Sequence, residues 1–130
     1  MSITSDLAQQ LVTLSGDLDQ LYMDLVSDGQ YGLANQVSQA ESDLKQAATN
    51  LYSMDIDDQI NAVAGAANQL TTLTSDISNS AAKLAASQAR IAAISGIVSS
   101  ILSVVSDLGT GNIAGAVSAA GQAAGLIGKA

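Results

Sequence analysis

Leucines recur every three or four residues from Leu7 to Leu25, and this spacing constrains the fold more than any other feature of the sequence. Steps of four, three, four, three and four form the a/d seam of a coiled-coil-like helix, here Leu7, Leu11, Leu14, Leu18, Leu21 and Leu25. We therefore predict a helix from about Ile3 to Ser27. The next residues, DGQYG at 28–32, contain two glycines that permit the positive φ of a C-cap and turn.

A second seam with the same spacing follows the turn. Its positions are Leu33, Val37, Ala40, Leu44, Ala47 and Leu51. Because the connection is short, we expect this second helix to run antiparallel to the first. Ser38 and Glu41 also match a capping box, which would start the helix near Gln39, but we prefer the longer helix because the seam begins earlier.

One long helix is predicted next. The aspartates of MDIDD at 54–58 suit a turn followed by the positive N-terminal end of a helix. No proline interrupts the seam before Gly109, and its positions are Ile60, Val63, Ala67, Leu70, Ile77, Leu84, Ile91, Val98 and Val105. A continuous helix of about fifty residues would be roughly 75 Å long. Ser95-Gly96 is a candidate kink that could instead divide it.

Residues 91–128 contain one charged side chain, Asp107, and are predicted to form an apolar helical hairpin. An Ile/Val-rich arm at 91–108 and a Gly/Ala-rich arm at 112–128 are separated by glycines. Small residues lie four apart at Gly111, Gly115 and Ala119, and again at Gly121 and Gly125. Such spacing lets helix backbones approach closely and is common where helices associate in lipid. Because each glycine costs about 1 kcal/mol in a helix, this arm needs a partner surface of protein or lipid.

Three interpretations of the hairpin stay open. In the first it is buried core, packed against the bundle or a second chain. In the second it inserts into a membrane under some conditions, although neither arm reaches the roughly 20 apolar residues of a spanning helix and the tyrosines at 22, 31 and 52 lie far away. In the third it is a flexible tail, although a seam of apolar residues favours a helix, namely Ile113, Val117, Ala120, Ala124 and Ile127.

Charge and composition argue against several functional classes. Residues 1–58 hold ten acidic residues against Lys45, whereas residues 59–130 carry a net charge of +1. An acidic chain of this kind lacks the basic surface that binds nucleic acid. The chain has no Cys or His, which supply the usual metal ligands and the thiol and imidazole groups of catalysis. We predict a protein that is not an enzyme, needs no cofactor and has no identified small-molecule substrate, and whose acidic face could dock a basic partner.

Short chemical motifs do not change this prediction. The segments SDLK at 42–45 and SAAK at 80–83 fit the Ser-x-x-Lys pattern of penicillin-recognising serine enzymes, in which the lysine helps to deprotonate the serine. Serine is so frequent here that chance matches are expected, and the partner motifs of that family are absent. The acids at 17, 19, 55, 57 and 58 lack the series of a calcium loop. We assign no catalytic, cofactor or metal residue.

Two segments carry a family resemblance. AAISGIVSSILSVVS at 92–106 and GNIAGAVSAAGQAAGLIG at 111–128, about a quarter of the chain, resemble in pattern the apolar hairpin of the α-helical pore-forming toxins. The resemblance implies a soluble form that hides a hairpin, which later inserts into a target membrane. The Ser/Ala/Gln/Asn-rich composition without His or Pro also looks like that of signal-less secreted helical-bundle proteins, such as filament or translocator subunits.

The N-terminal segment MSITSDLAQQ has neither a basic n-region nor an apolar h-region, so we expect no cleavable signal peptide. Export by a signal-independent route and a cytoplasmic location are both left open.

The sequence therefore predicts one all-α domain over residues 1–130, an antiparallel coiled-coil-like bundle with one long helix and a C-terminal apolar hairpin. Residues 1–84 form its acidic portion and 85–130 its Ala/Gly/Ser-rich portion. The favoured function is a secreted, self-associating toxin or translocator component that engages membrane; the alternative is a soluble scaffold or partner-binding bundle whose hairpin is an oligomer interface. The predicted membrane or interface residues are Ile94, Ile97, Val98, Ile101, Leu102, Val104, Val105, Ile113, Gly115, Val117, Gly121, Gly125, Leu126 and Ile127.

Overall fold

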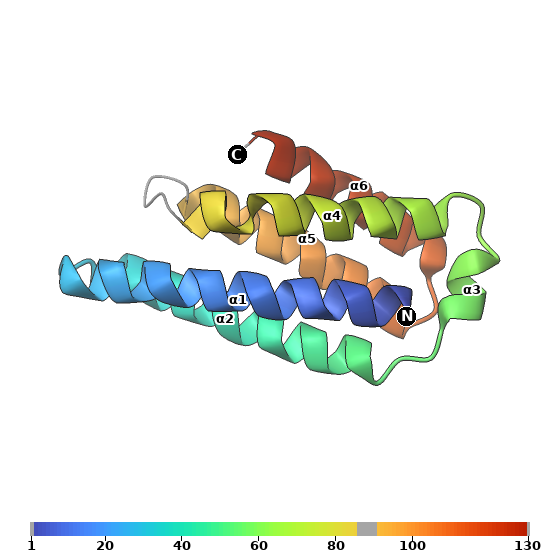
Figure 1. Cartoon of the computed structure of the whole chain (residues 1–130), viewed down its shortest axis with the longest axis horizontal. Coiled ribbons are helices and arrows are strands. Elements are labelled where there is room, and N and C mark those ends of the chain that lie inside the picture. The colour runs from blue at the N-terminus through green and yellow to red at the C-terminus, as the bar shows by residue number, and fades with distance from the viewer. Residues whose placement is uncertain (1, 86–90, 130) are drawn as a thin grey trace.

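The computed structural model describes residues 2–85 and 91–129, and in these residues it contains helices and no strands. The helices are α1 (Ile3–Ser27), α2 (Tyr31–Tyr52), α3 (Asp57–Asn61), α4 (Ala66–Ala85), α5 (Ile91–Gly109) and α6 (Ile113–Lys129) (Figure 1). The predicted all-α bundle with apolar C-terminal helices is confirmed.

Local signals define both ends of α1. The Ser2 hydroxyl accepts a hydrogen bond from the Ser5 N–H at 2.9 Å and so caps the first turn. At the other end Gly29 has a positive φ of 76°, and the Gln30 N–H donates to the Leu25 carbonyl at 2.9 Å. All six leucines of the predicted seam are buried. The predicted first helix and the turn after it are therefore confirmed.

The helix α2 begins at Tyr31, so the alternative start near Gln39 is wrong and Ser38-Glu41 is not a capping box. It packs antiparallel to α1, as the short turn requires (Figure 1). Five positions of the predicted seam are buried and Leu33 is half-buried. The longer helix forms because its apolar periodicity provides a buried face from the first turns onward.

The prediction of one long helix is wrong. Asp57–Asn61 forms the short helix α3, and a turn at 62–65, in which Gly65 has a φ of +80°, separates it from α4. The helix α4 ends at Ala85, and α5 begins at Ile91 and runs in the opposite direction (Figure 1). Residues 86–90 of the predicted helix lie outside the described residues. Ser95-Gly96 does not divide α5.

Burial explains why the chain folds back instead of extending. A straight rod of fifty residues would be about twice as long as α1 or α2, which could cover only half of its apolar seam. In the folded chain α4 lies against α1 and α5 lies against α2, so both halves of the seam are covered. Leu70, Leu73 and Ile77 of α4 are accordingly no more than 1% exposed.

The five long helices form a closed ring around one core. Along this ring α1 lies beside α2, α2 beside α5, α5 beside α6, α6 beside α4, and α4 beside α1. The short helix α3 contacts α4 at the end of the bundle where α1 begins (Figure 1). The buried apolar side chains of all these helices belong to a single cluster. The apolar hairpin α5–α6 thus contributes to this common core.

Candidate functional site

The loop between α5 and α6 has the local features that a tight helical hairpin needs. Gly111 has a φ of +80°, a conformation that glycine adopts without strain, and its N–H donates to the Leu108 carbonyl at 3.2 Å. Asn112 then caps α6, because its side-chain oxygen accepts a hydrogen bond from the Gly115 N–H at 3.1 Å. The predicted break between the two arms is confirmed at this loop.

Most of the predicted membrane or interface residues are buried inside the bundle. The buried ones are Ile94, Ile97, Val98, Ile101, Val104, Val105, Ile113 and Ile127. Leu102, Gly115 and Val117 are half-buried, whereas Gly121, Gly125 and Leu126 are exposed. In this conformation the buried apolar side chains of the hairpin face the core, so their contact with lipid or a second chain requires the hairpin to move away from the other helices.

The middle of the buried face of α6 consists of alanines, and the predicted seam included only some of them. Ala116, Ala120 and Ala123 are 0% exposed, whereas the predicted seam positions Val117 and Ala124 are half-buried. The seam is correct at Ile113, Ala120 and Ile127 but shifts by one residue between them. Small side chains suit this face because α6 packs against both α4 and α5 and must approach both closely. The Ala-x-x-x-Ala spacing from 116 to 120 was the signal available in the sequence.

The outward face of the hairpin is small and uncharged. On α5 it exposes serines at 95, 99, 103 and 106, and on α6 it exposes mainly glycine, alanine, serine and glutamine. The one charged residue between positions 91 and 128 is Asp107, which is half-buried near the end of α5. By length and composition α5 is the one helix in the described part of the chain that could cross a membrane, a property it shares with core helices of soluble proteins.

The glycines at 121 and 125 do not serve close helix packing within the chain. A Cβ atom added at Gly121 would meet only the Gln69 Nε2 at 3.7 Å, and one added at Gly125 would meet nothing within 4 Å. Neither glycine has a positive φ. The four-residue spacing of these glycines suggested close contact between helix backbones. In the structure both glycines instead lie on the open surface of α6.

We expect Gly121→Ala and Gly125→Ala each to raise the free energy of unfolding by about 0.5–1 kcal/mol, because alanine has the higher helix propensity and space is available. Urea unfolding followed by circular dichroism measures this gain. Gly111→Ala is the matched control, since its φ of +80° should make the same substitution destabilising. A loss of stability in the Gly121 or Gly125 variant would show that the surface of α6 is covered in solution, for instance by a second chain.

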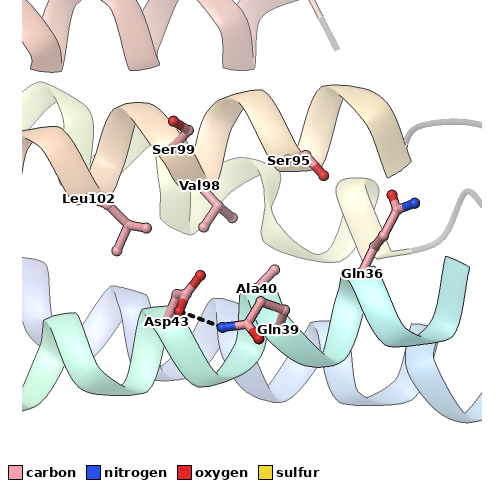
Figure 2. Close-up of a pocket in the computed structure, with 8 residues that line it drawn as sticks. All are labelled: Gln36, Gln39, Ala40, Asp43, Ser95, Val98, Ser99 and Leu102. Carbon is pink, nitrogen blue, oxygen red and sulfur yellow. Dashed lines mark hydrogen bonds between the residues drawn. The ribbon is translucent and has the colours of Figure 1, made fainter. Parts of the chain in front are cut away.

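A groove runs along the interface between α5 and α2. One hollow of about 380 Å³ lies between Ala40 on α2 and Val98 on α5, with glutamine and serine side chains at its rim. Figure 2 shows Val98 and Leu102 extending from α5 toward α2, and Gln39 donating a hydrogen bond to Asp43 at 2.9 Å. A second hollow of about 380 Å³ shares Asp43 and Leu102 with the first and continues the groove. The outer edge of the interface between the hairpin and α2 is therefore open to solvent along this groove.

Apolar contacts hold the hairpin to the other helices. Within the described residues, the side-chain hydrogen bonds of the hairpin are local: Ser103 to the Ser99 carbonyl, Thr110 to the Asp107 carbonyl, and the Gly115 N–H to Asn112. The interfaces of α5 with α2 and of α6 with α4 are formed by buried apolar side chains. Displacing the hairpin would therefore leave few polar groups without partners.

One buried charged side chain lies outside the hairpin, between α1 and α2. Glu41 is 8% exposed, and its Oε1 has no hydrogen-bond partner among the described residues. The Ser15 hydroxyl on α1 donates to the Glu41 backbone carbonyl at 3.3 Å. Burial, the nearby Asp19 carboxylate and a hydrogen bond with Asp19 raise the pKa of Glu41, and Lys45 opposes this shift. No pattern in the sequence indicates that Glu41 and Asp19 lie close together, because the packing of α1 against α2 brings them together.

The remaining motifs do not come together as a site. Ser42 and Lys45 are both exposed on α2, and the side chain of Lys83 lies outside the described residues. In the described part of the chain, no three acidic side chains are arranged to hold a metal ion, and this includes the aspartates at 55, 57 and 58.

Comparison with models of known protein families, with curated proteins and with solved structures found no match to this chain.

Proposed function

We propose that the protein is a non-enzymatic helical bundle that is secreted, self-associates and engages membrane through the α5–α6 hairpin, as a toxin or translocator component does. The observation that carries this proposal is the distribution of charge. Between positions 91 and 128 the hairpin has one charged side chain, Asp107, and Lys129 follows at the end of α6, whereas residues 1–58 hold ten acids. Surface helices of a purely soluble bundle usually carry charge on their outward face.

The dimensions of the hairpin and its contacts also support this function. A helix of 19 residues such as α5 is about 28 Å long, close to the roughly 30 Å of a bilayer core. The polar side chains of both arms are mostly serines, glutamine and asparagine, which can hydrogen-bond across helices in lipid. The groove beside α2 marks the solvent-exposed edge of one interface at which the hairpin would separate from the bundle.

Flotation with phosphatidylcholine vesicles, with and without anionic lipid, tests the proposal at pH 7 and pH 5. We expect the full chain to float, and Ser103→Lys to reduce flotation by about 100-fold, because a lysine costs about 2.5–3.5 kcal/mol in the centre of a spanning helix. Ser103 is exposed, so the soluble fold should be retained. Circular dichroism of the variant in buffer checks this.

Ser38→Lys on α2 is the matched control, because it adds the same charge at an exposed serine outside the hairpin. It should float like the unmodified chain. The membrane proposal is wrong if the full chain stays with the aqueous fraction at both pH values, or if both lysine variants float equally well.

A second function, a soluble scaffold or partner-binding bundle, is favoured by a different observation. Eight of the predicted contact residues are already buried within a single chain, so the hairpin needs no lipid to cover them. For this function, light scattering after size exclusion should give a defined oligomer, and no vesicle should bind. A monomer that floats with vesicles contradicts it.

A further inference from the structure

Four apolar residues lie close together in the sequence on either side of the turn between α1 and α2, and we call Tyr22, Met23, Val26 and Tyr31 the tip patch. Met23 is 57% and Tyr31 64% exposed, Val26 is exposed, and Tyr22 is half-buried. The first three residues line a hollow of about 300 Å³, and Tyr31 opens α2 directly after the turn. The other exposed large hydrophobic side chains of the described residues are dispersed over other parts of the bundle, at Val12, Tyr52 and Leu126. Single exposed apolar residues are ordinary, but a group of them indicates a contact surface.

Acidic residues on α1 border the tip patch in the sequence. The first basic residue in the sequence is Lys45, so α1 and the first half of α2 carry acids alone. Asp19 is exposed one helical turn before Met23. Asp24 is exposed beside Met23 and accepts a hydrogen bond from the Gln20 amide at 3.1 Å. Such a rim repels an anionic lipid surface and attracts a partner whose apolar residues are flanked by positive charge.

We infer that the tip patch binds a basic amphipathic helix of a partner protein. In this mode apolar side chains of the partner, spaced three or four residues apart, cover Met23 and Val26, and one of them enters the hollow. Lysine or arginine residues beside that apolar stripe pair with Asp19 and Asp24.

The residue types of the patch suit this partner. Methionine has a flexible, unbranched side chain that adapts to different apolar surfaces. Tyrosine provides an apolar ring with a hydroxyl group, and it is enriched at protein interfaces. The inference is independent of the membrane proposal, because it concerns α1 and α2 and leaves the α5–α6 hairpin in place.

Fluorescence anisotropy of the full chain with a labelled amphipathic helical peptide of leucine and lysine tests the inference. Binding should weaken as salt is raised, and it should exceed that of a scrambled leucine–lysine peptide and of a leucine–glutamate peptide. Combining Met23→Ser with Val26→Ser should weaken it by tenfold or more, since the apolar contact is lost. Asp19→Asn with Asp24→Asn should weaken binding at low salt and flatten its salt dependence.

Val12→Ser is the matched control, because it removes an exposed apolar side chain from α1 about three turns from the patch. It should leave binding unchanged, and all variants should retain the circular dichroism spectrum because the replaced side chains are exposed. If the scrambled peptide binds as well as the amphipathic one, the interaction is general charge attraction and the inference is wrong. The inference is also wrong if Val12→Ser weakens binding as much as the Met23/Val26 variant does. A Met23/Val26 variant that keeps peptide binding but loses vesicle flotation would overturn it too, since the patch would then contact lipid.

Discussion

Ile101→Ala is expected to lower the free energy of unfolding by about 2–5 kcal/mol. Ile101 lies near the middle of α5 and is 0% exposed within the common core. Its truncation removes apolar contacts and leaves a cavity that close-packed neighbours fill only in part. Because a small domain is typically stable by only about 5–15 kcal/mol, this loss is a large share of the total. Urea unfolding followed by circular dichroism measures it directly.

Leu102→Ala is the matched control for this prediction, since Leu102 is half-buried beside the α2–α5 groove. We expect it to cost clearly less than Ile101→Ala, because solvent already reaches the site. Equal losses in the two variants would mean that α5 presents a different face to the core.

Val98 is also buried, at 4% exposed, so it is unsuitable for a charged substitution that tests membrane binding. A charge there should unfold the bundle whichever function the hairpin has.

Glu41→Gln is expected to raise the free energy of unfolding at pH 7 by on the order of 1–2 kcal/mol, because it removes a buried negative charge that lies near the Asp19 carboxylate. Burial and the Asp19 carboxylate raise the folded-state pKa of Glu41 above its ordinary value of 4.5, while Lys45 opposes the shift. Above the folded-state pKa the side chain is charged in both states, and the folded state bears the cost. Below 4.5 it is protonated in both states and the cost disappears.

The unmodified chain should therefore gain a contribution to stability as the pH falls from the folded-state pKa of Glu41 toward 4.5, and Glu41→Gln should lack that gain. Urea unfolding at pH 7 and pH 5 separates the two proteins. Asp43→Asn is a suitable control, because Asp43 is a half-buried acid on the same helix that already has a hydrogen bond from Gln39. Parallel stability changes in the Glu41 variant and the unmodified chain would contradict the assigned burial of Glu41.

Two helices and the hairpin could be predicted because spacing and glycine position determine them locally. The leucine seam gave α1, and the loop at Gly109-Thr110-Gly111 gave the division between α5 and α6. The long helix was wrong because an apolar seam has the same period whether a helix continues or is interrupted. Gly65 was the available local signal for the first interruption, and its φ of +80° shows why a glycine stands there. What decided the fold was the burial of both halves of the seam, a property of the whole chain.

The candidate site was predictable as a segment but not as a surface. Sequence identified the two apolar arms, yet the face that each arm buries depends on which helices lie beside it. Ala116 and Val117 are adjacent and both apolar, and only the closeness of α4 and α5 selects the smaller one for the interior. The burial of Glu41 was not predictable for the same reason, because it depends on the pairing of α2 with α1.

The closed ring of helices also bears on the order in which the protein is made. The helix α6 joins the ring by lying against both α4 and α5, and it follows both in the sequence. A ribosome therefore releases the isoleucine- and valine-rich α5 before the helix that covers one side of it. During that interval the nascent chain exposes apolar surface of the kind that aggregates or binds chaperones. This exposure ends when α6 has also left the ribosome and packs against α4 and α5.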